Sequence, residues 1–112
     1  MHFEWDDNKN RRNRAKHGVG FETAALVFDD PCALTQTDPS SLGEERWITL
    51  GTVDQGAVLL LVHAWFEEDG EEIIRIISAR AATAHERRIY EEAHEGTKGR
   101  HRSFKGKKGR EY

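Results

Sequence analysis

The chain has 112 residues, of which 37% are apolar and 33% are charged, and its formal net charge is −3. This length suits one domain with a small core, and the apolar content is too high for a fully disordered chain. No apolar run approaches the roughly 18 residues of a membrane helix, and residues 1–7 lack the features of a signal peptide, so we expect a cytoplasmic protein without a membrane span. Cys32 is the only cysteine, which excludes an intramolecular disulfide and a cysteine-based zinc site.

Charge is distributed unevenly along the chain. Residues 1–97 contain 10 Lys and Arg against 19 Asp and Glu, whereas residues 98–112 contain seven against one. We expect residues 1–96 to fold as one domain and residues 97–112, which are basic and glycine-rich, to form a flexible tail. The tail is interpreted either as inert or as an arm that holds RNA.

Two helices are predicted near the start of the chain. After an extended lead-in at Phe3-Glu4-Trp5, Asp6 or Asp7 can cap a helix that Gly18 ends. One face of this polar helix carries three basic residues, Lys9, Arg12 and Lys16. Such a face must meet solvent or a polyanion. A second helix has apolar residues at core-facing spacing, namely Phe21, Ala24, Ala25 and Phe28.

Strands and a last helix follow. The four candidate strands are residues 33–37, 46–53, 57–66 and 72–79. Short turns between them imply antiparallel neighbours. Thr83 and Glu86 form a capping box that opens a helix ending near Gly96. The pattern predicts an α+β fold in which an antiparallel meander is combined with two N-terminal helices and one C-terminal helix.

Metal chemistry is not favoured by the sequence. The six histidines include no pair at i, i+4 with a carboxylate partner. In His85-Glu86 and in His94-Glu95 the histidine and its neighbouring glutamate point to different sides of a helix. Phosphate-loop and nucleophile-elbow motifs are also missing from the sequence. We expect neither a metal nor a cofactor.

Arginines in apolar strands are the stronger signal. Arg75 is flanked by isoleucines, so it needs either a carboxylate partner or a site that uses a fixed positive charge. Arg46 and Arg80 lie at the ends of predicted strands and can converge with it. Arg75 and Arg80 have opposite alternation, so they share a face only if the strand ends or bulges between them.

Two further residues are candidates for acid–base work. His63 is either a hydrogen-bonded core histidine or a catalytic group, and Tyr90 either packs the last helix or donates a proton. Cleavage of RNA by its own 2′-hydroxyl needs a base, an acid and fixed cations at the phosphoryl oxygens. Arginines supply the last of these without a metal ion.

Several short motifs occur in a specific order between residues 3 and 92. They are Phe3-Glu4-Trp5-Asp6, Lys9, Asn13, Lys16-His17-Gly18-Val19, Phe21-Glu22, Phe28-Asp29-Asp30-Pro31, Glu44-Glu45-Arg46, Arg75-Ile76-Ile77-Ser78-Ala79-Arg80, Glu86-Arg87-Arg88 and Tyr90-Glu91. Taken together, this set resembles the BrnT family of type II bacterial toxins, which are ribonucleases with a RelE-like fold.

The resemblance implies an RNA-cleaving toxin that a BrnA-like antitoxin neutralises. It implies a complex of two toxins and two antitoxins that reaches operator DNA only through the antitoxin. The resemblance implies catalytic roles for Arg46, Arg75, Arg80 and Tyr90, and His63 joins the expected catalytic residues as the acid–base candidate named above. The expected RNA-binding residues are Lys9, Arg12, Lys16, His17 and Arg87, of which Lys16 and His17 form either an RNA-facing or a structural pair.

Two other functions remain open from the sequence. The chain is alternatively a catalytically weak antitoxin-binding partner that acts in transcriptional autoregulation, which its acidic body favours. It is alternatively a plain RNA-binding module that uses the basic helix and the tail.

Overall fold

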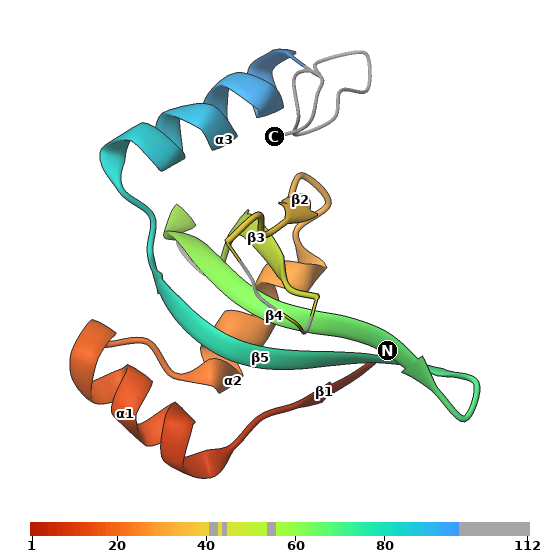
Figure 1. The fold of residues 1–112 in the computed structure, drawn as a ribbon. Coiled ribbons are helices and arrows are strands. Elements are labelled where there is room, and N and C mark those ends of the chain that lie inside the picture. Colours follow the sequence, from red (N-terminus) through yellow and green to blue (C-terminus); the bar gives the residue numbers. More distant parts are fainter. Residues whose placement is uncertain (41–42, 44, 54–55, 97–112) are drawn as a thin grey trace.

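We describe a computed structural model of the chain, which covers residues 1–40, 43, 45–53 and 56–96. Residues 41–42, 44, 54–55 and 97–112 lie outside this described part, and they include Glu44 of the family motifs and the predicted basic tail. The elements are β1 (His2–Glu4), α1 (Asp7–His17), α2 (Phe21–Ala24), the 3₁₀ helix η1 (Ala25–Asp29), β2 (Leu34–Thr37), β3 (Trp47–Thr52), β4 (Val58–Glu68), β5 (Glu71–Ala81) and α3 (Ala84–Gly96). They form an α+β fold around one five-stranded sheet (Figure 1). No helix in the described part is long and apolar enough to cross a membrane.

The sheet has the order β1-β5-β4-β3-β2. Strands β2 to β5 form the predicted antiparallel meander. The prediction of a purely antiparallel sheet is wrong, because β1 pairs in parallel with β5 through Phe3 opposite Ile74. The sequence of a three-residue strand does not indicate which strand it pairs with. Its partner β5 lies about 70 residues further along the chain.

A β-bulge in β5 decides where the arginines point. Val62 pairs with Ser78, whereas the next residue, His63, pairs with Ile76. Ile77 is therefore an extra residue in β5, and it resets the alternation of the side chains. Arg75 and Arg80 consequently lie on the same face of the sheet, the outcome that the sequence allowed only with a bulge.

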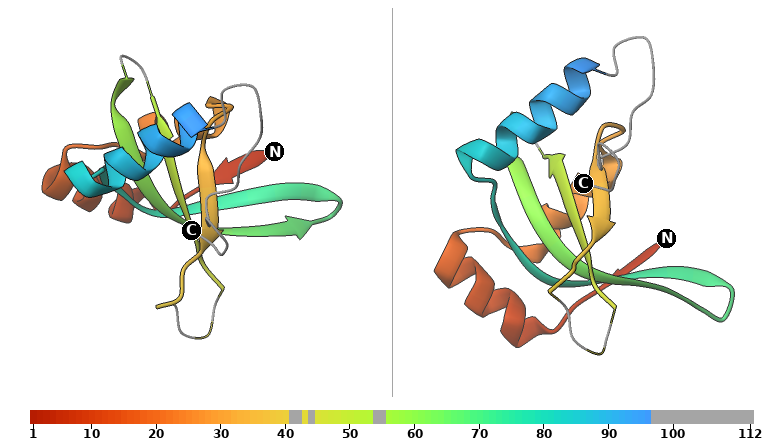
Figure 2. Two further views of the ribbon diagram at one scale, coloured as in Figure 1. Left: turned by 90° about the horizontal axis from the view of Figure 1, so that it is seen from above. Right: turned by 45° about the horizontal axis from the view of Figure 1, so that its top comes forward.

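Helices cover both faces of the sheet. In Figure 1, α1, α2 and η1 lie on one side of the sheet and α3 on the other. Phe21 and Val27 from the first group pack on Leu61 and Ile74 in one buried cluster. Tyr90 from α3 joins Leu34, Leu50, Val58 and Ala82 in the second cluster. Seen from above, α3 crosses over the strands (Figure 2).

Hydrogen bonds rather than apolar contacts hold α1. Oδ1 of Asp6 accepts the backbone N–H groups of Asn8 and Lys9 at 2.7 and 3.1 Å, and Gly18 ends the helix with φ 74°, as predicted. The buried amide of Asn13 donates to the carbonyl oxygens of Ala79 and Val19 at 2.8 and 2.9 Å. It also accepts the Ala79 N–H at 3.2 Å. Asn13 thus imitates a neighbouring strand at the edge of β5 and fixes the position of the basic helix.

The second predicted helix consists of a short α-helix followed by a 3₁₀ helix. Residues 21–24 form one turn of α-helix, and residues 25–29 continue as η1. Asn10 supports the start of α2, because its Oδ1 accepts the N–H of Phe21 at 2.8 Å. The first N–H groups of a helix have no acceptor within the helix. Asn10 of α1 supplies an acceptor for one of them and so caps α2 from a neighbouring helix.

Candidate active site

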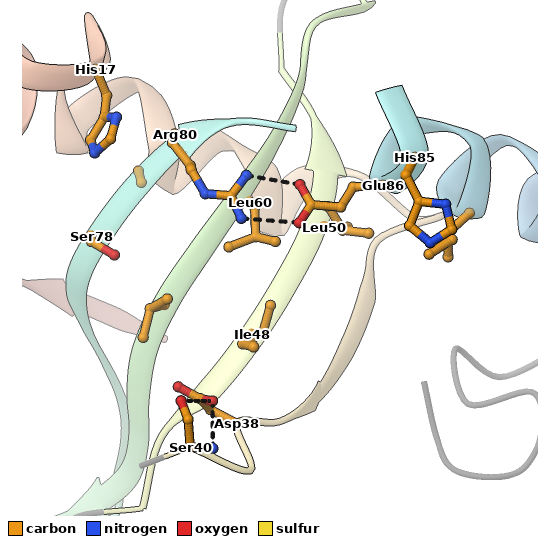
Figure 3. Close-up of a pocket in the computed structure, with 13 residues that line it drawn as sticks. His17, Asp38, Ser40, Ile48, Leu50, Leu60, Ser78, Arg80, His85 and Glu86 are labelled. Atoms are coloured by element: carbon orange, nitrogen blue, oxygen red, sulfur yellow. Dashed lines mark hydrogen bonds and ion pairs between the residues drawn. The ribbon is translucent and has the colours of Figure 1, made fainter. Parts of the chain in front are cut away.

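A cleft of about 540 Å³ lies on the α3 side of the sheet. It is lined by residues of the strands β3, β4 and β5 and of the turn after β2. The last residue of α1 and the first two turns of α3 complete the lining. The polar side chains that line it are His17, Asp38, Ser40, Ser78, Arg80, His85 and Glu86 (Figure 3). Apolar side chains of the sheet, including Ile48 and Leu60, form the rest of the lining. The cleft therefore combines an apolar base with polar and charged side chains around it.

Arg80 and Glu86 form a bidentate ion pair in this cleft. Nη1 and Nη2 of Arg80 donate to Oε1 and Oε2 of Glu86 at 2.8 and 3.0 Å. The hydrogen bonds from Arg80 lower the pKa of Glu86 to about 2, and bonding to Glu86 raises the pKa of Arg80. The guanidinium is therefore a permanent charge, and its side chain remains 37% exposed.

The predicted capping box holds this pair. The Thr83 N–H donates to Oε1 of Glu86 at 2.9 Å, and the Glu86 N–H donates to Oγ1 of Thr83 at 3.1 Å. Glu86 thus joins the start of α3 to the end of β5. An arginine clamped in this way loses less conformational entropy when it binds an anion.

Two histidines lie on opposite sides of the Arg80–Glu86 pair in Figure 3. His17 is the last residue of α1, and His85 is the second residue of α3. From the sequence, His17 is expected to bind RNA or to have a structural role, and His85 is a candidate only as a metal ligand. The signal for His85 was its place within the capping box, next to a carboxylate that follows a strand arginine.

The other two arginines do not line the cleft. Nε of Arg75 donates to Oε2 of Glu4 at 2.8 Å, and its Cζ lies 5.1 Å from the ring centre of Phe66. The side chain is exposed, because the neighbours Ile74 and Ile76 point to the opposite face. Arg46 precedes β3 and is partly buried, and its carbonyl oxygen accepts the Asp38 N–H at 2.8 Å. The expected convergence of the three arginines is therefore not seen.

His63 is buried on the face opposite the cleft, with no exposed surface. Its Nδ1–H donates to the carbonyl oxygen of Ala64 at 3.1 Å, and Nε2 accepts the hydroxyl of Thr49 at 2.8 Å. Its ring also meets Phe28 edge-on at 5.1 Å. Burial lowers the pKa of His63 to about 4, so the ring is neutral at physiological pH. Its surroundings are those of a hydrogen-bonded core histidine.

Tyr90 is buried between α3 and the sheet. Its hydroxyl donates to Oδ2 of Asp30 at 2.6 Å, and the same oxygen accepts the N–H and hydroxyl of Thr52 at 2.9 and 3.0 Å. Burial and the bond to Asp30 raise the pKa of Tyr90 to about 12. This hydroxyl ties α3 to the end of η1 and to β3, and Tyr90 does not line the cleft.

The basic residues expected to bind RNA are all exposed. Lys9, Arg12 and Lys16 lie on α1, whose last residue is His17, and Arg87 lies on α3 next to Glu86. The polar helix therefore leads to the edge of the cleft. Within the described residues, no group of three or more His, Cys, Asp or Glu side chains is placed to hold a metal ion.

Fold and cleft together define a small α+β protein with an arginine-centred, imidazole-flanked cleft on one face of a mixed sheet. The sequence model of the family described as "Ribonuclease toxin, BrnT, of type II toxin-antitoxin system" matches residues 5–86. The chain therefore belongs to the BrnT family. The crystal structure of the Brucella abortus ribonuclease toxin BrnT is similar, with a TM-score of 0.52 and 22% identity over 74% of this chain and 97% of that one. At this identity the likeness shows a shared fold. A search of curated protein sequences finds no match.

Proposed function

We propose that this chain is the metal-independent endoribonuclease toxin of a type II toxin–antitoxin system, with a RelE-like architecture and a cytoplasmic site of action. It cleaves RNA by attack of a 2′-hydroxyl on the adjacent phosphorus, which releases the 5′-oxygen and leaves a 2′,3′-cyclic phosphate. The observation that carries this proposal is the clamped guanidinium of Arg80 between His17 and His85 in one cleft.

Arg80 has the donors that the reaction needs. A guanidinium has five N–H groups, and in the described part Glu86 accepts two of them and the Ala81 carbonyl oxygen a third, at 3.2 Å. The two that remain, on Nε and Nη2, can donate to the non-bridging oxygens of a phosphate. Charge that develops on these oxygens in the transition state then meets a preorganised cation.

The two histidines supply the proton transfers. One neutral imidazole takes the proton of the attacking 2′-hydroxyl, and the other, as an imidazolium, protonates the departing 5′-oxygen. Histidine is the side chain most often used as a general acid or base in catalysis. In this mechanism His63 and Tyr90 stabilise the fold, and Arg75 and Arg46 contact flanking phosphates or hold the sheet.

RNA reaches the cleft along α1. Lys9, Arg12 and Lys16 provide successive positive charges for the phosphate backbone, and the helix ends at His17. Arg87 and the basic tail extend the same electrostatic attraction. A BrnA-like antitoxin, in a complex of two toxins and two antitoxins, neutralises the enzyme and carries it to operator DNA.

The decisive experiment is cleavage of a defined RNA by the purified chain in EDTA. We expect 2′,3′-cyclic phosphate or 3′-phosphate ends and a loss of about 10²-fold or more in rate for Arg80→Ala, by analogy with removal of one oxyanion donor. Arg88→Ala, which removes an exposed arginine from the same helix as Glu86, is the matched control and should leave the rate unchanged. A requirement for Mg²⁺ with 3′-hydroxyl products would refute the mechanism.

A second experiment assigns the two histidines. His17→Ala and His85→Ala should each slow the cleavage of ordinary RNA. A substrate with sulfur in place of the bridging 5′-oxygen needs no acid to expel its leaving group, so it should rescue only the variant that lacks the acid. Rescue of neither variant, or normal rates in both, would exclude this pair.

A catalytically weak antitoxin-binding protein is the alternative function. The carboxylate of Glu86 on Arg80 favours it, because the same carboxylate repels an incoming phosphate. The alternative predicts no RNA cleavage above that of Arg80→Ala, together with intact antitoxin binding.

A further inference from the structure

A second pocket lies at the β4–β5 hairpin and takes no part in the proposed chemistry. It has a volume of about 590 Å³, and its lining is Trp47, Trp65, Phe66, Glu67, Gly70 and Glu72. We call it the hairpin pocket. Trp47 pairs with His63 and Trp65 pairs with Ile74, so both indoles lie on the face opposite the cleft. The hairpin extends beyond the rest of the sheet in Figures 1 and 2.

The hairpin pocket presents an exposed aromatic side chain beside a partly buried one. Trp65 is 40% exposed, and its ring meets Trp47 in a T-shaped contact with ring centres 5.3 Å apart. The buried indole N–H of Trp47 meets no acceptor in the described part of the chain. A polypeptide that docks here would cover exposed aromatic surface and bring carbonyl oxygens to a region with an unpaired donor.

The hairpin that carries this pocket is strongly acidic, and two of its acids, Glu67 and Glu72, line the pocket. Residues 67–72 contain five acids and one glycine. Glu67 lies directly opposite Glu72 in the ladder, and Glu68 lies directly opposite Glu71. Like charges at such positions repel each other and destabilise the hairpin. Asp69 at the turn adds a fifth negative charge and has a φ of 53°, which a non-glycine residue rarely adopts.

This arrangement fits a cation and disfavours RNA. Carboxylates repel a phosphate backbone, whereas an ammonium or guanidinium group gains both from the carboxylates and from an indole face. Glu72 already accepts the Trp65 indole N–H at 2.5 Å, so the ring and an acidic group are held together. The matching ligand is a polypeptide segment that presents Lys or Arg beside apolar surface.

We propose that the hairpin pocket is a docking site for a Lys- or Arg-bearing segment of the antitoxin, whose cationic group lies over the Trp65 indole between Glu67 and Glu72. This inference rests on the proposed toxin function, which supplies the partner. The antitoxin then holds the toxin at a surface separate from the cleft. Neutralisation and anchoring are therefore carried by different parts of the complex.

The test uses the full-length toxin and the antitoxin encoded beside it, with the dissociation constant measured by titration. Trp65→Ala should raise Kd at least tenfold, and Trp65→Phe should raise it less. Glu67→Gln should raise Kd about threefold or more and make binding less sensitive to salt, whereas Glu68→Gln, on the opposite face of β4, should leave Kd unchanged. Glu91→Gln with Glu92→Gln, which removes two exposed acids from α3, is the matched control and should leave Kd unchanged.

Stability gives a second readout that a merely structural role would not produce. Glu67→Gln relieves the cross-strand repulsion with Glu72, so the free toxin should melt about 1–2 °C higher although the complex is weaker. RNA cleavage by the free variants should match that of the wild type. Lower stability with unchanged Kd would overturn the proposal.

Other occupants of the pocket give distinct results, each of which would overturn the proposal. If removal of residues 97–112 changes Trp65 fluorescence in the free toxin and the antitoxin does not, the ligand is the chain's own tail. If Trp65→Ala abolishes self-association of the free toxin without affecting Kd, the ligand is a second copy. If the wild-type chain binds no antitoxin, this inference fails, whereas RNA cleavage in EDTA would still support the proposed enzyme.

Discussion

Replacement of Asn13 by alanine should detach the polar helix α1 from the sheet. This helix has almost no apolar residues, so its position depends on the three hydrogen bonds that Asn13 makes with the backbone of Ala79 and Val19. Asn13→Ala leaves both the N–H and the C=O of Ala79 unpaired, in a residue that has no exposed surface.

The size of the effect follows from these groups. A buried backbone group without a partner costs about 1–3 kcal/mol, and a third hydrogen bond is worth about 1 kcal/mol. Partial solvation of the freed edge offsets some of this loss, so we expect a destabilisation of about 3 kcal/mol. For a domain of this size the change lowers the melting temperature by about 10–20 °C.

Urea denaturation followed by tryptophan fluorescence measures the free energy of unfolding, and hydrogen exchange reports on the Ala79 amide. Arg12→Ala, an exposed change on the same helix, should alter stability by less than about 0.5 kcal/mol. A loss below about 1 kcal/mol for Asn13→Ala, with the Ala79 amide still protected, would show that other contacts hold α1. Because α1 carries His17, the folded fraction of Asn13→Ala should also cleave RNA more slowly.

Three further changes test the core and its hydrogen bonds. The folded-state pKa of His63, about 4, lies below its unfolded value of 6.5, so its contribution is present above pH 6.5 and is lost as the pH falls. The free energy of unfolding should fall by about 2 kcal/mol between pH 6.5 and 5. The urea midpoint of His63→Gln should not show this dependence on pH. Tyr90→Phe removes the bond to Asp30 and should cost about 1.5–3 kcal/mol in a thermal melt, a difference that shrinks as the pH rises from 10 toward the folded pKa of about 12. Gly51→Ala places a Cβ 2.7 Å from Cγ1 of Val27 and should cost about 1–3 kcal/mol, which the double variant with Val27→Ala should partly recover.

The sequence predicted those features that depend on neighbouring residues. The cap at Asp6, the left-handed Gly18 and the capping box of Thr83 with Glu86 are all found, because each is a hydrogen-bonding or backbone preference confined to one turn. The antiparallel meander is found for a similar reason, since short turns leave few other ways to pair successive strands. The ordered motifs also placed the chain in the BrnT family, which the match to residues 5–86 confirms.

Only the tertiary structure determines which residues line the cleft. The flanking isoleucines suggested an enclosed Arg75, yet they point to the other face and leave it exposed beside Glu4. The pairing of β1 with β5 joins strands about 70 residues apart, and a three-residue strand does not specify its partner.

The cleft itself depends on distant parts of the chain. His17 and His85 are separated by 67 residues and meet the same cleft because Asn13 fixes α1 and Glu86 fixes α3. Side chains alternate between the two faces of a strand, so one extra residue changes the face on which all later side chains lie. The extra residue Ile77 therefore places Arg80 on the face of the sheet that carries the cleft. The sequence by itself therefore determined the helix caps, the meander and the family, whereas long-range pairing and one bulge decided which charged groups share a site.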